Sequence, residues 1–323
     1  MYDSAVNNPS EATSTRDSQV AEGRLGMVYV ALAAMLFASK GIFGKLLYQR
    51  GVGFEVLVTV RALIAMPLFG WMAFRRTGPR ADATPRIRGR ACLAAVIAGI
   101  VCYYVGALVD FWALMLIDAS IERVLLFSYP ALVVLISSFM RRQAPERRVV
   151  LAMLITYVGI FFAMGGVDLA ELETNLFGAS LVLIAALTTA IYFLIGERCV
   201  HELGSTRFAA IGMSASAVVL ALHFALFRSF DEVRALDAHS WVLLVILGIA
   251  CMFLPGLMQA EGVRRVGAQR AAIGSTVGPP TTIVLAALFL GERLNGWQLA
   301  GSAMIVVSVL ALSLGKAPVA PED

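Results

Sequence analysis

The sequence is dominated by ten apolar stretches of about 20 residues each, separated by short polar connections. A helix needs about 20 mostly apolar residues to cross the roughly 30 Å hydrocarbon core of a bilayer. The stretches are residues 27–47, 54–72, 91–116, 120–140, 148–167, 176–196, 207–227, 240–260, 268–290 and 297–315. Only 15% of all residues are charged, against about a quarter in soluble domains, so lipid is the expected solvent. We therefore predict an all-α polytopic membrane protein with ten transmembrane helices.

The lysines and arginines orient these spans, because cytoplasmic loops carry an excess of both residues. Of the 26 lysines and arginines, 18 lie in the two termini and in or beside the connections after every second span. The opposite side has four: Arg50, Arg228, Arg234 and Arg293. The last four lie within spans: Lys40, Lys45, Arg61 and Arg123. We predict an inner-membrane protein with both termini in the cytoplasm, a disordered tail at residues 1–23 and a second tail at 316–323.

The chain contains an internal repeat. A constant offset of 149 residues aligns residues 96–166 with 245–315 without a gap, so that VIAGIVC falls on VILGIAC. A repeat of five helices crosses the membrane an odd number of times, so the second copy enters from the other side. We predict two inverted five-helix halves, residues 24–167 and 168–315, around a central site that faces either side in turn.

The repeat carries a recurring set of residues. The second half has Ala268, then Pro279 eleven residues later, then Glu292 at the end of the span. The first half keeps Ala119 and Pro130 but has Gln143 where the acidic residue would fall. This pattern resembles the EamA-type repeat of the drug/metabolite transporter superfamily, over residues from about 24 to 315. The resemblance implies ten spans, cytoplasmic termini and small-solute transport, with export of an amino acid or related metabolite as the expected function.

Several charged side chains lie inside the predicted spans of the first half. They are Lys40, Arg61, Asp110, Glu122 and Arg123. A charge at the bilayer centre costs about 2.5–3.5 kcal/mol on insertion scales, so these groups should face a cavity or one another. The aligned positions of the second half are uncharged, which favours a one-sided role. Two hypotheses remain: a structural layer of ion pairs, or a substrate-binding layer whose excess cation holds a carboxylate or phosphate.

Aromatic residues, prolines and one histidine complete the candidate set. Tyr129 and Tyr192 are candidates for stacking on a substrate, with core packing as the alternative. Prolines inside spans remove backbone hydrogen bonds and are candidate hinges or static kinks: Pro130, Pro255, Pro279 and Pro280. His223 is a candidate for proton coupling, and a packing role is the alternative.

Other functions are less compatible with the sequence. The three histidines and four cysteines are scattered without metal-ligand spacing, and no P-loop is present, so neither a metal nor a cofactor is expected. An intramembrane enzyme is an alternative that lacks a catalytic motif, and a channel or receptor lacks a filter-like segment. Expected partners are a small-molecule substrate and the lipid bilayer, not nucleic acid; a homodimer stays open.

Overall fold

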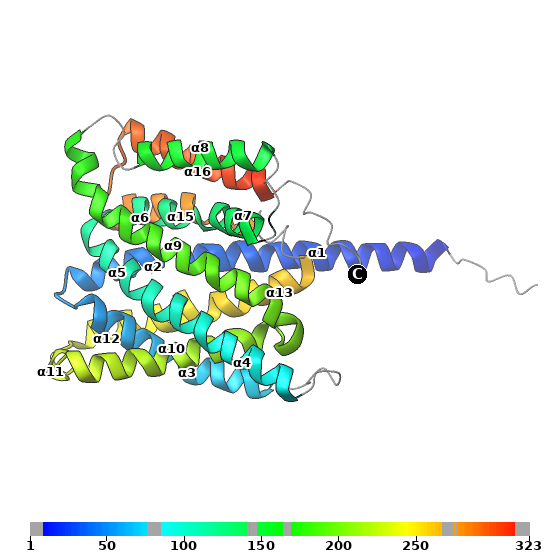
Figure 1. The fold of residues 1–323 in the computed structure, drawn as a ribbon, viewed down its shortest axis with the longest axis horizontal. Helices are drawn as coiled ribbons and strands as arrows, with labels where there is room; N and C mark the ends of the chain where they lie inside the picture. The colour runs from blue at the N-terminus through cyan, green and yellow to red at the C-terminus, as the bar shows by residue number, and fades with distance from the viewer. Residues whose placement is uncertain are drawn as a thin grey trace, which may run out of the picture.

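The computed structural model describes residues 9–75, 85–140, 142, 147–163, 169–266, 274–275 and 277–313, and every regular element within them is a helix (Figure 1). The first half comprises α1 (Pro9–Ala38), α2 (Lys40–Tyr48), α3 (Phe54–Arg75), α4 (Pro85–Gly99), the π-helix η1 (Ile100–Gly106), α5 (Ala107–Leu116), α6 (Ala119–Leu126), α7 (Tyr129–Met140) and α8 (Arg147–Ala163). The second half comprises α9 (Leu169–Leu203), α10 (Ser205–Phe227), α11 (Asp231–Arg234), α12 (Ala238–Gly248), the π-helix η2 (Ile249–Phe253), α13 (Leu254–Val266), α15 (Gly278–Phe289) and α16 (Gly296–Ser313).

Within the described residues, seven helical segments are long and apolar enough to cross a membrane: Gly23–Tyr48, Phe54–Met72, Gly89–Leu116, Ala119–Met140, Glu173–Cys199, Thr206–Phe227 and Ala238–Gln259. Shorter apolar helices at Leu154–Ala163 and Gly278–Phe289 fall within the predicted fifth and ninth spans. The predicted all-α polytopic membrane fold is therefore confirmed, while the number of ten spans stays a prediction.

The helix α1 begins earlier than the first predicted span. It starts at Pro9 and projects beyond the bundle at the end opposite α11 (Figure 1). The predicted disordered tail, residues 1–23, overlaps the start of this helix, and its disorder stays a prediction. Proline fits the first position of a helix because its missing N–H would be unpaired there, and no further proline interrupts the chain before the apolar span. The second predicted tail, residues 316–323, lies outside the described residues.

The offset of 149 residues recurs in the helix boundaries. It relates Gly99 to Gly248 as the last residues of α4 and α12, and Ile100 to Ile249 as the first residues of the two π-helices. It also relates the starts of α7 and α15, at Tyr129 and Gly278, and the starts of α8 and α16, at Arg147 and Gly296. Corresponding residues of the two halves thus begin and end the same kind of element.

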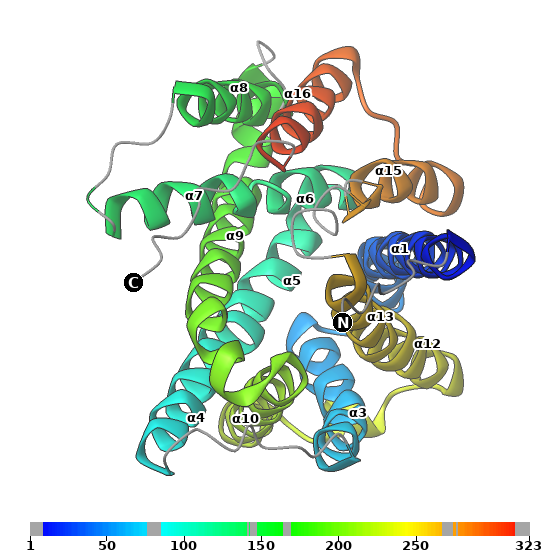
Figure 2. The same ribbon diagram turned by 90° about the vertical axis from the view of Figure 1, so that its right-hand side faces the viewer.

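Equivalent helices also make equivalent contacts. The helix α3 packs against its counterpart α10, and α8 packs against its counterpart α16, on opposite sides of the bundle (Figure 2). In the same way α4 packs on α10 as α12 packs on α3, and α5 packs on α9 as α13 packs on α1. This pattern is typical of two halves related by a pseudo-two-fold axis.

Candidate functional site

A cavity of about 260 Å³ lies in the interior of the bundle, between the two halves. Its walls come from α1, α2, α3, η1, α5, α6, α7, α9, α10, η2 and α13. Six of the seven predicted substrate-binding residues line it: Lys40, Arg61, Asp110, Arg123, Tyr129 and Tyr192. The seventh, Glu122, lies behind Lys40 and is almost completely buried. The structure therefore gathers in one place side chains that are up to 152 residues apart in the sequence, from Lys40 to Tyr192.

Residues related by the repeat line this cavity together. Arg61 and Met213, which correspond with an offset of 152 residues in this part of the repeat, both line it, as do Asp110 and its counterpart Gln259. The two π-helices contribute as well, with Cys102 of η1 and its counterpart Cys251 of η2. Wide π-turns inside α-helices are frequent at functional sites. The cavity therefore lies at the interface of the repeats, where transporters with inverted repeats place their substrate.

Lys40 forms a buried ion-pair triad with Asp110 and Glu122. Its Nζ donates to Asp110 Oδ2 at 2.5 Å and to Glu122 Oε1 at 3.2 Å. The three residues are 9%, 6% and 1% exposed, so water screens these charges poorly. They belong to α2, α5 and α6, and the triad thus connects three helices of the first half. Buried charges are tolerated when they are paired in this way, because the attraction between opposite charges offsets part of the cost of removing each from water.

Arg61 and Arg123 differ from Lys40 in having no carboxylate partner. Among the described residues, no carboxylate oxygen lies within 4.0 Å of either guanidinium. Arg61 is 8% exposed, and its Cζ lies 4.2 Å from the centroid of the Phe111 ring, which is a cation–π contact. The Nε of each arginine is buried without a hydrogen-bond partner. Both side chains therefore keep hydrogen-bonding capacity for a group that enters the cavity.

Aromatic rings form another wall of the cavity. Tyr129 stacks on Phe193 with centroids 5.3 Å apart and an angle of 9° between the rings. Tyr192 contacts Tyr103 edge to face, with centroids 5.0 Å apart. All four rings line the cavity beside the charged groups. The site therefore combines cationic donors with an apolar, aromatic surface.

Fully buried apolar side chains fill the bundle between this cavity and the end that carries α11. We call this group the apolar plug: Leu47, Leu57, Phe111, Leu114, Leu220, Leu244 and Leu247. In α3 and α10 the plug residue lies on the α11 side of the cavity residue: Leu57 before Arg61, and Leu220 after Met213. The plug therefore separates the cavity from the α11 end.

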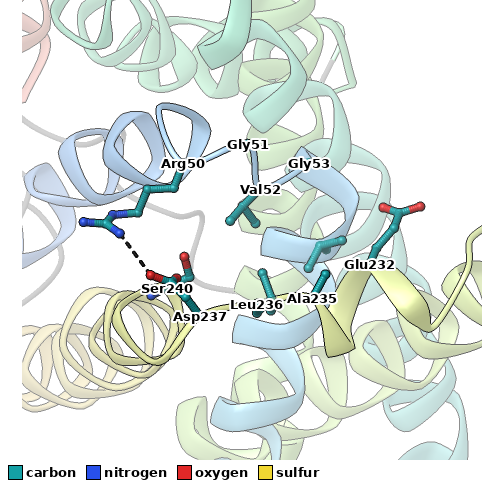
Figure 3. A pocket seen from close by; sticks show the side chains of 10 residues that line it. Arg50, Gly51, Val52, Gly53, Glu232, Ala235, Leu236, Asp237 and Ser240 are labelled. Atoms are coloured by element: carbon teal, nitrogen blue, oxygen red, sulfur yellow. Dashed lines mark hydrogen bonds and ion pairs between the residues drawn. The ribbon is translucent and has the colours of Figure 1, made fainter.

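Ion pairs between the two halves lie beyond the apolar plug. Arg228 of the second half pairs with Glu55 of the first and is 3.8 Å from Glu232. Arg50, between α2 and α3, donates to Asp237 at 3.2 Å (Figure 3). Asp237 also accepts hydrogen bonds from Ser240 at the start of α12, and these bonds hold its pKa below the ordinary value. The α11 end is thus closed by packing and by charge.

A second pocket of about 450 Å³ lies among these outer residues (Figure 3). It is larger than the central cavity, but its charged side chains, such as Arg50 and Asp237, are 40% and 56% exposed. Water therefore hydrates and screens them, and they need no ligand to balance their charge. The central cavity, with buried charges, is the stronger candidate for the functional site.

The candidate hinges and the candidate proton carrier have distinct positions. Pro130, Pro279 and Pro280 lie in the first turns of α7 and α15, where a missing N–H costs little, and Pro255 directly follows η2. His223 Nδ1 is 2.9 Å from the hydroxyl of Tyr104, and its ring packs against Phe227. His223 does not line the cavity. Hinge motion and proton coupling at these residues stay predictions.

The structure adds residues that the sequence alone does not single out. Cys102, Phe193 and Met252 line the cavity but are uncharged or one of many aromatic residues. The offset of 149 relates Cys102 to Cys251 and Tyr103 to Met252, and this relation is the sequence signal that could have identified Cys102 and Met252. Glu292 has another role: its carboxylate accepts hydrogen bonds from the first two backbone N–H groups of α6, at 2.9 and 3.1 Å. The acidic residue of the second repeat therefore caps a helix of the first.

The comparisons with known proteins agree with this architecture. The model of the EamA-like transporter family matches residues 24–165 and 176–314, one match for each half. The chain belongs to the EamA-like transporter family. This confirms the family resemblance, and the EamA-like protein is a multi-pass membrane transporter.

Its relatives include an uncharacterized transporter of Bacillus subtilis strain 168, YcbK, which is 31% identical over 88% of this chain and 91% of the relative. An uncharacterized inner membrane transporter of Salmonella typhimurium strain LT2, YicL, is 23% identical over 90% of this chain and 96% of the relative. A known crystal structure matches this EamA-like fold with a TM-score of 0.57 and 17% sequence identity, over 92% of this chain and 97% of the other. That likeness concerns the fold alone.

Proposed function

We propose that this protein is a secondary transporter that exports a small polar metabolite by alternating access. The observation that carries the proposal is the central cavity, which lies between two equivalent halves and is lined by buried charged residues of one half. A volume of about 260 Å³ is just below the range for sites that hold drug-sized molecules, about 300–1,000 Å³. The site therefore suits a solute of the size of an amino acid.

Alternating access requires one side of the site to be closed while the other can open. The apolar plug and the ion pairs of Arg50 and Arg228 close the α11 end. Opening this end requires α2, α3 and α5 to separate from α10 and α12, and the two halves are the natural moving bodies. The helix breaks at Pro130 and before Pro279 are candidate places for this bending.

We also propose that the protein lies in the inner membrane with both termini in the cytoplasm, which puts α11 on the outer face. The excess of lysine and arginine in the termini and in the connections after every second span, none of which contains α11, supports this orientation. Fusion of reporter proteins to each terminus tests it. Reporters that are active only outside the cytoplasm should stay silent at both ends, and activity at either end would contradict the orientation.

Solute counterflow in proteoliposomes tests the proposed mechanism. Vesicles preloaded with an unlabelled metabolite should accumulate the labelled form against its gradient, which a carrier does and a channel does not. The variant Arg61→Gln, in the cavity, should lower the initial rate of counterflow at least tenfold. The control Arg234→Gln alters an exposed residue of α11 and should leave it unchanged.

Two results of this experiment would contradict the proposal. Flux without counterflow would indicate a channel. Failure of every metabolite in a broad panel to exchange, with a correctly folded protein, would exclude a secondary transporter of small metabolites.

A further inference from the structure

The charged layer at the cavity contains more cationic than anionic side chains, and only one of the cations, Lys40, is paired with the anions. Lys40, Arg61 and Arg123 contribute three positive charges, and Asp110 and Glu122 contribute two negative charges. Both carboxylates contact the same ammonium group, that of Lys40. The guanidinium groups of Arg61 and Arg123 therefore have no counter-ion among the described residues, and one positive charge of the five-residue layer is unbalanced.

The other groups that the structure describes around Arg61 and Arg123 do not supply a negative charge or a hydrogen-bond acceptor for the buried Nε atoms. The Arg61 guanidinium lies on the face of Phe111, which leaves its N–H groups in the plane free to point into the cavity. The Arg123 guanidinium lies against Gly278, the first residue of α15, where the helix dipole adds positive potential. The Nε atoms of both arginines are buried and unpaired. An unpaired buried cation is costly, and a bound anion would remove that cost.

The rest of the cavity indicates the body of such an anion. Tyr129 and Phe193 form a stacked pair beside Arg123, and Tyr192 packs on Tyr103 on the same wall. Rings of this kind bind flat or branched apolar groups and offer a hydroxyl for one further hydrogen bond. Planar guanidinium groups bind a carboxylate with two parallel hydrogen bonds.

We propose that the transported solute is a small organic monoanion, a carboxylate with an apolar or aromatic body, held by Arg61 and Arg123. This inference rests on the proposed function, and it divides the charged layer into two parts. The triad of Lys40, Asp110 and Glu122 is a structural brace with one net negative charge, while the two arginines bind the carboxylate. A single negative charge balances the layer, with three positive and three negative charges in all.

Ligand-induced thermal stabilisation of the purified protein in detergent tests the inference without transport. The probes are a carboxylate with a branched or aromatic body, its uncharged amide and the corresponding amine, because a ligand that binds the folded state raises the unfolding temperature. The carboxylate should stabilise the protein, and the amide and amine should not. Arg61→Gln and Arg123→Gln should each weaken carboxylate binding about 10- to 100-fold, as expected for loss of hydrogen bonds to a charged group.

Two controls separate binding from folding. Arg50→Gln also removes one positive charge, but on the outer surface, and should bind the carboxylate within twofold of the wild type. Arg61→Gln should leave the unfolding temperature of the ligand-free protein within about 2 °C of the wild type, because no carboxylate partner is lost. A large drop there would assign Arg61 to the brace and overturn the inference.

The outcomes distinguish this inference from the proposed function. Equal stabilisation by the amide or amine would overturn the anionic substrate while leaving a transporter in place. Exchange of cations or neutral solutes, but not carboxylates, in proteoliposomes would do the same. Binding of carboxylates that depends on both arginines, without counterflow of any of them, would support the site and contradict the transport mechanism.

Discussion

The ion-pair triad gives the sharpest prediction about stability. Lys40→Met removes the shared cation and leaves the carboxylates of Asp110 and Glu122, which are 6% and 1% exposed, without a partner. Removing one member of a buried pair costs about 3–5 kcal/mol. At about 2 °C per kcal/mol for a chain of this size, the unfolding temperature should fall by about 6–10 °C.

The assay is thermal unfolding in detergent at a fixed heating rate, because membrane proteins often unfold irreversibly. A second variant keeps the test interpretable if the first does not fold. The triple variant Lys40→Met, Asp110→Leu, Glu122→Met removes all three charges, and it should recover most of the lost stability, since apolar replacements of buried ion pairs are often neutral or stabilising. An unfolding temperature of Lys40→Met within 2 °C of the wild type would refute the reasoning. So would a triple variant no more stable than the single one.

Three further predictions concern residues outside the cavity. Glu292→Ala removes the cap of α6 and should lower the stability by about 1–2 kcal/mol in thermal unfolding; a loss below 0.3 kcal/mol would exclude a capping role. Gly99→Ala places a Cβ in the backbone of α10 and should cost about 1–3 kcal/mol, whereas Gly70→Ala, where a Cβ meets nothing, should not destabilise. The lowered pKa of Asp237 stabilises the fold at pH values above the ordinary pKa of aspartate, and this contribution is lost as the pH falls through the lowered pKa. The wild type should therefore lose more stability between pH 5 and pH 2 than the variant Asp237→Asn. Equal losses of stability in the two proteins would contradict this prediction.

Some of the candidate site was accessible from the sequence for an energetic reason. A charge inside an apolar span is expensive in lipid, so Lys40, Arg61 and Asp110 had to face a polar interior wherever the fold placed them. The structure indeed brings them to one cavity. The same reasoning could not find Cys102 or Met252, because an uncharged side chain is equally compatible with lipid, core and cavity.

The pairing within the site could not be predicted. Lys40 lies 70 residues from Asp110 and 82 from Glu122, while Arg61 and Arg123 have the same charge and lie in the same kind of apolar segment. Nothing in the local sequence says which cation meets a carboxylate. Helix packing decides it, because the distances between side chains depend on how α2, α5 and α6 meet.

The sequence by itself determined that the chain is helical, lies in a membrane and contains a repeat. Those properties depend on local quantities: the length of apolar stretches, the loops that carry arginine, and a constant offset of 149 residues. The tertiary structure alone decided where the cavity lies, which charges are neutralised, and that Glu292 of one half caps α6 of the other. These features depend on contacts between segments remote in sequence, and only the packing of the helices fixes such contacts.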